Sequence, residues 1–387
     1  MDIKLAGRLL ETEEYYFSKK LGEIEKMNQT GPKVINLGIG SPDLPPAPEV
    51  IETLTREASQ PGNHAYQSYK GSMILRTAIA DWYQRYYGVQ LDPEKEVLPL
   101  MGSKEGIMHV CMTYLQEGDE ALIPDPGYPT YASAVRLSGA SAVKYELSAE
   151  KNWLPDLDLL SKQISERTKL MWLNYPHMPT GAKAPLSFFK ELVAFAGEHN
   201  ILLCHDNPYS FILNDKPLSL LSVEGAREVA IELNSLSKSS NMAGWRVGML
   251  LGKEARLSEI LRFKSNMDSG MFLPLQLAAA KALYLSADWY RSLNQVYAER
   301  KKLAEGLLDR LGCSYRGDQA GLFIWAHVPK GYNSGFELSD EVLQKSRVFL
   351  TPGGIFGEVG NEYIRISLCA NTATFDAALD RMQQSEF

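Results

Sequence analysis

The chain has few cysteines, no long apolar run and no excess of basic charge, and each lack excludes a class of protein. The cysteines show neither CxxC pairs nor metal-ligand spacing, which predicts reduced core thiols in a cytoplasmic protein; they are Cys111, Cys204, Cys313 and Cys369. No apolar run approaches the ~20 residues that cross a bilayer, and the charged N-terminal stretch shows no apolar signal segment. The net charge of −7 gives no reason to expect nucleic acid or an anionic membrane as partner.

The length of 387 residues exceeds the roughly 250–300 at which a single core stops growing, so we expect more than one domain. Apolar residues at helical spacing predict a helical arm over 1–32, ended by Gly31-Pro32. Residues 33–48 predict a short strand and a proline-rich connector that belongs in part to a small domain. We expect a large domain over 49–280 and a small C-terminal domain over 281–387.

Helical patterns alternate with short apolar runs through the predicted large domain. The runs predict buried strands over 97–100, 120–123, 141–145, 170–174, 201–205, 229–233 and 247–251. This alternation predicts an α/β fold with a mostly parallel sheet covered by helices on both faces, in which ligands bind at the carboxyl ends of strands. A long helical stretch over 273–311 leads into a smaller α+β part, with strands near 321–327, 348–350 and 363–367.

Lys238 lies in Ser235-Leu236-Ser237-Lys238, and Arg246 follows eight residues later. An amine between a hydroxyl and a guanidinium suits a phosphorylated aldehyde cofactor. The amine condenses with the carbonyl, and Ser235 and Arg246 hold the phosphate. The alternative is a polar loop with two solvated cations.

Polar and aromatic groups follow other predicted strands. Ser103 and Lys104 open a helix after strand 97–100, where free backbone N–H groups make an anion site. The alternative is an ordinary helix start with Ser103 as its cap. Tyr128 lies in a loop stiffened by prolines and glycine, so it can be a flat wall against an aromatic ring, unless it and Tyr131 are rim packing.

Three further residues stand at strand ends or inside a strand. Asp206 ends strand 201–205, where it can pair with a protonated pyridine nitrogen or make an Asx turn. Asn174 precedes a proline-rich turn, in which it or Thr180 can satisfy backbone groups. Arg365 lies inside an apolar strand, where a substrate carboxylate or an internal salt bridge would satisfy it.

Taken in chain order, these motifs resemble the class I and II aminotransferases, fold-type-I enzymes that depend on pyridoxal 5′-phosphate. The resemblance covers nearly the whole chain and implies a large cofactor-binding domain with a smaller α+β domain. It implies that Lys238 is the Schiff-base lysine. The phosphate ligands would be Ser235, Arg246 and the backbone N–H groups of Ser103 and Lys104, with no metal in the site.

The same resemblance assigns roles to the remaining candidates. Asp206 would partner the pyridine nitrogen, Tyr209 would donate to the 3′ oxygen of the cofactor, and Tyr128 would stack on its ring. Asn174 would stand among the cofactor-binding residues. On the substrate side, Gly40 would lie beside the carboxylate and Arg365 would bind it.

The segment from Tyr66 to Arg76 resembles the family's Tyr-x4-Gly-x3-Leu-Arg pattern. In that pattern the tyrosine reaches the phosphate of the neighbouring subunit's cofactor. The resemblance therefore implies a homodimer with shared active sites, to which Tyr66 contributes.

One turn departs from the family. Its usual Asn-Pro-Thr-Gly is Met178-Pro179-Thr180-Gly181 here, and Met cannot donate the hydrogen bond that the Asn gives to the 3′ oxygen. Tyr209 would remain as a donor, and His177 is a candidate substitute. The change puts the tuning of the cofactor in doubt, but not its binding.

The resemblance implies transfer of an amino group between an α-amino acid and a 2-oxo acid. Ser265–Gly270, with Phe272 and Gln276, is similar to the LL-diaminopimelate aminotransferase branch; aspartate, alanine or aromatic donors are alternatives. A β-lyase acting on cystathionine or cysteine conjugates could use the same lysine. A non-catalytic cofactor-binding regulator is a remote alternative, because the chain has no spare length or basic segment for a DNA-binding domain.

Overall fold

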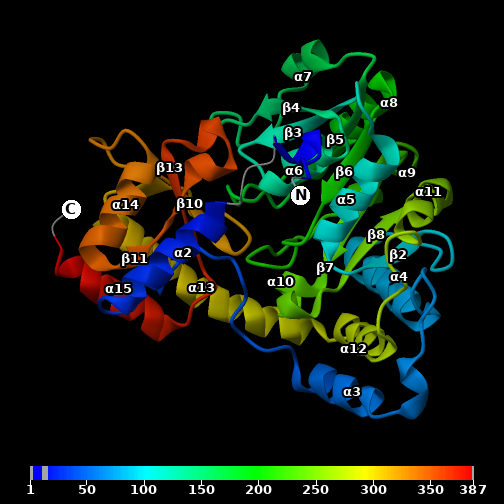
Figure 1. The fold of residues 1–387 in the computed structure, drawn as a ribbon, viewed down its shortest axis with the longest axis horizontal. Helices are drawn as coiled ribbons and strands as arrows, with labels where there is room; N and C mark the ends of the chain where they lie inside the picture. Colours follow the sequence, from blue (N-terminus) through cyan, green and yellow to red (C-terminus); the bar gives the residue numbers. More distant parts are fainter. Residues whose placement is uncertain (1–2, 11–15, 386–387) are drawn as a thin grey trace.

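The computed structural model describes residues 3–10 and 16–385, and its larger sheet has seven strands in the order β2-β8-β7-β6-β5-β3-β4 (Figure 1). The strands are β2 (Val97–Leu100), β3 (Glu120–Asp125), β4 (Ser141–Glu146), β5 (Thr168–Asn174), β6 (Leu202–Asp206), β7 (Ala230–Ser235) and β8 (Gly248–Gly252). Every predicted run overlaps one of them. The pairs among β3, β4, β5, β6 and β7 are parallel, which confirms the mostly parallel sheet.

Strand β8 runs antiparallel to both of its neighbours, β7 and β2. An antiparallel neighbour needs no crossover helix. The chain therefore passes from β7 through the short helices α10 (Leu236–Ser239) and η3 (Ala243–Trp245) directly into β8. This connection holds Lys238 and Arg246 at the carboxyl end of β7.

Helices cover both faces of this sheet, as predicted. One face packs against α5 (Ser103–Tyr114), α6 (Pro129–Leu137) and α11 (Glu254–Lys264). The other packs against α4 (Met73–Tyr87), α8 (Leu186–His199) and α12 (Leu273–Leu283), with α3 (Pro48–Ala58) outside α12. Successive side chains of β5 point to opposite helix layers. Leu170 and Trp172 face the first layer, and Met171 and Leu173 face the second. Two short helices, α7 (Leu157–Gln163) and α9 (Ala226–Val229), lie near α8.

The prediction of a buried strand over 141–145 is wrong in one respect. Strand β4 pairs only with β3 and ends the sheet, so most of its side chains are exposed or half-buried, with Tyr145 the buried exception. An edge strand has a neighbour on one side only, and less of it is covered.

The smaller part has a four-stranded antiparallel sheet in the order β12-β13-β10-β9. Its strands are β9 (Ser314–Tyr315), β10 (Phe323–His327), β12 (Thr351–Pro352) and β13 (Tyr363–Ser367), and its helices are α13 (Ala287–Arg310), α14 (Gly335–Ser346) and α15 (Thr372–Gln383). The stretch predicted as helical over 273–311 is two helices, α12 and α13. Strand β1 (Ile35–Asn36) pairs with β11 (Val348–Phe349), so residues from the predicted connector join this part. The domain boundaries themselves stay a prediction.

The predicted helical arm contains α1 (Gly7–Leu10) and α2 (Tyr16–Gln29); its residues 1–2 and 11–15 lie outside the described residues. Arg347 fixes the end of α2, because its guanidinium donates to the carbonyl oxygens of Met27 (3.1 Å) and Pro32 (2.7 Å). Figure 1 shows α2 running across the smaller part beside β10. Among the described residues, no helix is both long and apolar enough to cross a bilayer.

Candidate active site

A cavity of about 660 Å³ lies where β5, β6 and β7 end, and both parts of the chain line it. Its lining includes every predicted site residue except Tyr66: Gly40, Ser103, Lys104, Tyr128, Asn174, Asp206, Tyr209, Ser235, Lys238, Arg246 and Arg365. The carboxyl ends of parallel strands meet at one edge of a sheet. Residues far apart in the sequence therefore face one space.

Lys238 points to the loop that carries Gly40. Its Nζ donates a hydrogen bond to the carbonyl oxygen of Gly40 at 2.7 Å. Burial lowers the pKa of Lys238 below its usual value, and the nearby Arg365 and Arg246 guanidinium groups act in the same direction. A lowered pKa leaves more of the amine neutral, which is the nucleophilic form.

Asp206 is a buried carboxylate with one oxygen engaged. Its Oδ2 accepts from the Tyr131 hydroxyl at 3.0 Å, and Asn174 Nδ2 donates to its backbone oxygen at 2.5 Å. Its Oδ1 is buried and has no hydrogen-bond partner among the described residues. Burial raises the pKa of Asp206 to about 6. A buried acceptor without a donor is costly, so Oδ1 is a place where a ligand N–H would be stabilised.

Hydrogen-bond donors gather at the other end of the cavity. Helix α5 begins at Ser103, after Gly102 with φ of 85°, where a Cβ would collide with the guanidinium of Arg246. Ser235 and Ser237 lie 2.9 Å apart through their hydroxyl oxygens, and Arg246 Nη1 lies 3.5 Å from the Ser237 hydroxyl. A helix N-terminus, two hydroxyls and a guanidinium together suit a phosphate. The sequence analysis did not single out Ser237, although it directly precedes Lys238.

Arg365 lies in β13, one of the two inner strands of the smaller sheet. Its Nη2 donates to the Gly38 carbonyl at 2.8 Å. Its Cζ lies 3.9 Å from the centre of the Phe323 ring and 4.6 Å from that of Phe356. The rings restrict the guanidinium to one orientation and keep water from its faces, which favours paired hydrogen bonds to a carboxylate.

Three tyrosines stand around Asp206. Tyr131 is not rim packing, because it is buried, bonds to Asp206 and stacks on Trp172 with ring centres 5.2 Å apart. Tyr128 is partly exposed in the cavity and meets Tyr131 edge-on. Tyr209 lies edge-on to Phe323, and burial raises the pKa of Tyr209, so its phenol is neutral and can donate.

The turn that departs from the family pattern is ordered by its own side chains. Asn174 Oδ1 accepts from the Met178 backbone N–H at 2.7 Å, and Thr180 Oγ1 lies 2.8 Å from His177 Nδ1. Met178 lines the cavity, with its sulfur 3.3 Å from Nη1 of Arg365. His177 is buried and is not among the lining residues, and burial lowers its pKa to about 3.

The lining of the cavity differs from the expected site in two respects, at Tyr66 and at helix α2. Tyr66 is 89% exposed and lies in a surface hollow with Gly270 and Phe272, outside this cavity. Helix α2 lines the cavity with Phe17, Ser18 and Leu21, which the sequence analysis missed. The only sequence signal for them was the apolar face of the predicted arm.

These features fit pyridoxal 5′-phosphate. The unpartnered Asp206 oxygen suits a protonated ring nitrogen, and Tyr128 offers a flat ring. The donors at Ser103, Ser235, Ser237 and Arg246 suit its phosphate, and Lys238 lies between the two ends.

Comparison with known proteins agrees with the geometry. The family model for aminotransferase class I and II matches residues 32–382. The LL-diaminopimelate aminotransferase of Dehalococcoides mccartyi is 43% identical over 95% of both chains, and that of Halothermothrix orenii 41% over 98% of both. The structure of substrate-bound BacF from Bacillus subtilis matches with a TM-score of 0.94, 36% identity and coverage of 99% of this chain and 98% of that one.

A more distant structure, an aspartate aminotransferase mutant from Thermus thermophilus, has 24% identity and a TM-score of 0.92 over 99% of this chain and 100% of that one, which shows a shared fold. These relatives give no support to the β-lyase or regulator alternatives. The chain belongs to the class I and II aminotransferase family, and it is a fold-type-I aminotransferase whose cofactor is pyridoxal 5′-phosphate.

Proposed function

We propose that the Lys238 cavity is the site at which this aminotransferase binds its cofactor and exchanges the amino group. The observation that carries the proposal is the unpartnered Oδ1 of Asp206, a residue that lines the same cavity as Lys238 and Arg246. When bound there, the cofactor supplies an electron sink for the carbanion formed at the substrate α-carbon.

The residues around the cofactor divide into ring and phosphate ligands. Asp206 would accept from the ring nitrogen and keep it protonated, Tyr209 would donate to the 3′ oxygen, and Tyr128 would stack on the ring. Ser235, Ser237, Arg246 and the backbone N–H groups of Ser103 and Lys104 would hold the phosphate. Asn174 supports this arrangement through the backbone of Asp206 and Met178.

Lys238 is the proton carrier of the reaction. Arg365 binds the α-carboxylate of the amino acid beside Gly40, which turns the α-C–H toward Lys238 Nζ. The neutral amine of Lys238 would take the α-proton and deliver it to the cofactor carbon that carries the aldehyde in the free cofactor. Burial, which lowers the pKa of Lys238, keeps that amine ready to accept the proton.

LL-Diaminopimelate is the first donor to test, because the two most similar relatives described above are named for it. Aspartate, alanine and aromatic amino acids are the alternatives. We also propose that the enzyme is a cytoplasmic homodimer in which Tyr66 completes the partner's phosphate site, since Tyr66 lies outside the cavity of its own chain.

A donor panel tests this proposal. The holoenzyme is mixed with each amino acid, and conversion to pyridoxamine phosphate is followed by absorbance, with the 2-oxo acid product identified. We expect conversion with at least one α-amino acid, and none with Lys238→Ala. Release of ammonia and thiol instead of a 2-oxo acid and pyridoxamine phosphate would contradict amino transfer.

A further inference from the structure

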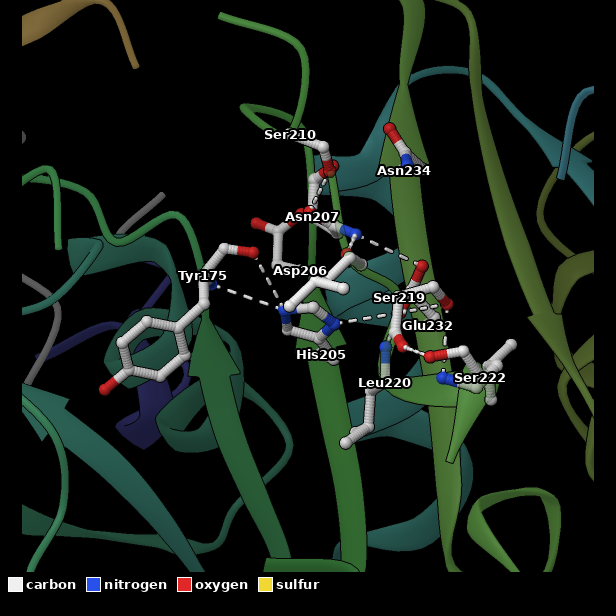
Figure 2. Close-up of polar contacts among 12 residues, drawn as sticks. Tyr175, His205, Asp206, Asn207, Ser210, Ser219, Leu220, Ser222, Glu232 and Asn234 are labelled. Carbon is white, nitrogen blue, oxygen red and sulfur yellow. Dashed lines mark hydrogen bonds and ion pairs between the residues drawn. The ribbon is translucent and has the colours of Figure 1, made fainter. Parts of the chain in front are cut away.

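A wholly buried polar network lies behind Asp206, on the other face of the sheet (Figure 2). Successive side chains of a strand point to opposite faces, so His205 faces away from the cavity that Asp206 lines. In the β6–β7 register His205 stands opposite Glu232, and its Nδ1 lies 2.9 Å from Glu232 Oε2. Both side chains are fully inaccessible to solvent.

Glu232 is the centre of this network. Five groups contact its two oxygens: His205 Nδ1, the Ser219 hydroxyl at 3.0 Å, the Leu220 N–H at 2.9 Å, the Tyr83 hydroxyl at 2.7 Å and Asn207 Nδ2 at 3.3 Å. Placing a carboxylate in the core without such partners would cost several kcal/mol. Packing alone does not require a carboxylate here, since an apolar side chain would avoid that cost.

The network surrounds the backbone of Asp206. Its two chain neighbours, His205 and Asn207, both contact Glu232. The other ring nitrogen of His205, Nε2, lies 3.1 Å from the Tyr175 carbonyl oxygen and 3.3 Å from its N–H. Tyr175 follows Asn174, whose amide donates to the Asp206 carbonyl. The backbone of Asp206 is therefore tied to β7 on one side and to the end of β5 on the other.

We propose that Glu232 is a positioning residue for the cofactor: through His205 and Asn207 it fixes the strand end that aims Asp206 Oδ1 at the ring nitrogen. The proposal rests on the function proposed above for Asp206. Hydrogen bonds weaken steeply with angle and distance, so a small rotation of this strand end loosens the contact to the ring nitrogen. Glu232 acts through Asp206 and touches neither cofactor nor substrate.

The test is Glu232→Gln, which keeps the shape of the side chain. It replaces one carboxylate oxygen, which accepts hydrogen bonds, with an NH₂ group that faces the same donors and cannot accept from them. We measure the dissociation constant of pyridoxal 5′-phosphate, the visible circular dichroism of the bound cofactor and the pH midpoint of its absorbance. We expect the dissociation constant to rise at least tenfold and the midpoint and dichroism to shift.

The matched control is Glu120→Gln. Glu120 is also a buried carboxylate and accepts from the Ser165 hydroxyl at 2.7 Å, but it lies at the amino end of β3, away from the cavity. We expect it to lower the melting temperature while the cofactor constant stays within about twofold of wild type. A milder second variant, Ser219→Ala, removes one donor from Glu232 and should raise the cofactor constant about threefold.

The outcomes separate the two proposals. If the wild-type protein does not bind the cofactor at Lys238, the proposed function fails. If it does, and Glu232→Gln and Ser219→Ala both show the wild-type constant and spectra, Glu232 has no positioning role. An equal weakening by Glu120→Gln would show that general loss of stability, not position, is the cause.

Discussion

Lys238 lies in the cavity, where its amine donates a hydrogen bond to the Gly40 carbonyl oxygen. This position distinguishes it from Lys104 and Lys264. Lys104 also lines the cavity, but it lies in the first turn of α5, at the phosphate end. Lys264 is buried on α11 and pairs with Asp268. Of these three lysines, Lys238 is therefore the one whose position fits the proposed Schiff base.

We predict that Lys238→Ala abolishes turnover while cofactor still binds non-covalently, because the phosphate and ring ligands remain. Borohydride reduction of the wild-type holoenzyme, followed by peptide mapping, should place the label on Lys238. A label on Lys104 or Lys264 would contradict the assignment. Lys253→Ala is the control, since Lys253 lies on the surface paired with Glu228.

Met178 occupies the position where the family usually has an Asn that donates to the 3′ oxygen. We predict that Met178→Asn lowers the pH midpoint of the bound cofactor's long-wavelength absorbance. One hydrogen bond to a charged group contributes about 1.5–3 kcal/mol, or roughly one to two pKa units. Coinciding titration curves for the two proteins would mean that Met178 only packs against Arg365.

Asp206 gives the cofactor-free protein a defined pH dependence. Burial raises the pKa of Asp206 to about 6 from 3.8, so the folded state holds this proton more tightly than the unfolded state. Stability from this group is therefore present below about pH 4 and is lost as pH rises toward 6, by on the order of 3 kcal/mol.

Asp206→Asn removes that titration. We predict that the free energy of unfolding of the cofactor-free variant, relative to wild type, increases between pH 4 and pH 7. Urea unfolding at both pH values measures it. A constant difference would show that Asp206 does not titrate in this range.

At the scale of the element, the connection between β7 and β8 is what makes the site. Because β8 is antiparallel to β7, the chain turns back over residues 236–247 and needs no long crossover helix. That short return places Ser235, Lys238 and Arg246 beside the N-terminus of α5. A Cβ at Gly248, the first residue of β8, would collide with the Ser103 N–H, which shows how closely the two elements approach.

Helix α2 lines the cavity beside Arg365. The ring of Phe17 lies 5.9 Å from the guanidinium carbon of Arg365. We predict that Phe17→Ala raises the KM for the amino donor about tenfold, equivalent to about 1.4 kcal/mol of lost apolar contact, with the cofactor dissociation constant unchanged. Steady-state kinetics and a cofactor titration measure the two. A changed cofactor dissociation constant with an unchanged KM would contradict a role of α2 in substrate binding.

At the scale of the whole molecule, large apolar side chains are exposed around the Tyr66 segment. They include Tyr66, Tyr69, Met73, Ile74, Met267 and Phe272. Gly270 approaches the carbonyl oxygens of Gln67 and Ser68, so the two chain segments that carry this surface lie side by side. Exposed apolar side chains gathered in this way are typical of interaction surfaces, which is consistent with the homodimer proposed above.

We predict that Tyr66→Ala weakens cofactor binding and that mixing its subunits with Lys238→Ala subunits restores activity. In a heterodimer one site has Lys238 from the first chain and Tyr66 from the second, so it is intact. Up to half of the wild-type activity per heterodimer should return, with sedimentation showing that heterodimers form. Heterodimers without recovered activity would mean that Tyr66 serves no shared site.

Much of the fold followed from local signals. Apolar runs located the strands of the large sheet because strands buried on both faces are apolar throughout, and helical spacing located the helices because only one face of each is buried. The candidate site was identified from the motif around Lys238 and from the acid at the end of β6. The carboxyl ends of parallel strands lie at one edge of the sheet, so residues at those ends lie close together in space.

The tertiary structure decided what no local pattern contains. Strand order put β4 at an edge and so exposed it, and stacking on Trp172 brought Tyr131 under Asp206. The return of the N-terminal chain placed Phe17 over Arg365, and strand register set Glu232 opposite His205. The class of enzyme could be read from local motifs, because its chemistry rests on a few residues at fixed strand ends. The distant side chains that contact those residues became visible only in the folded chain, because such contacts depend on register and packing rather than on spacing along the chain.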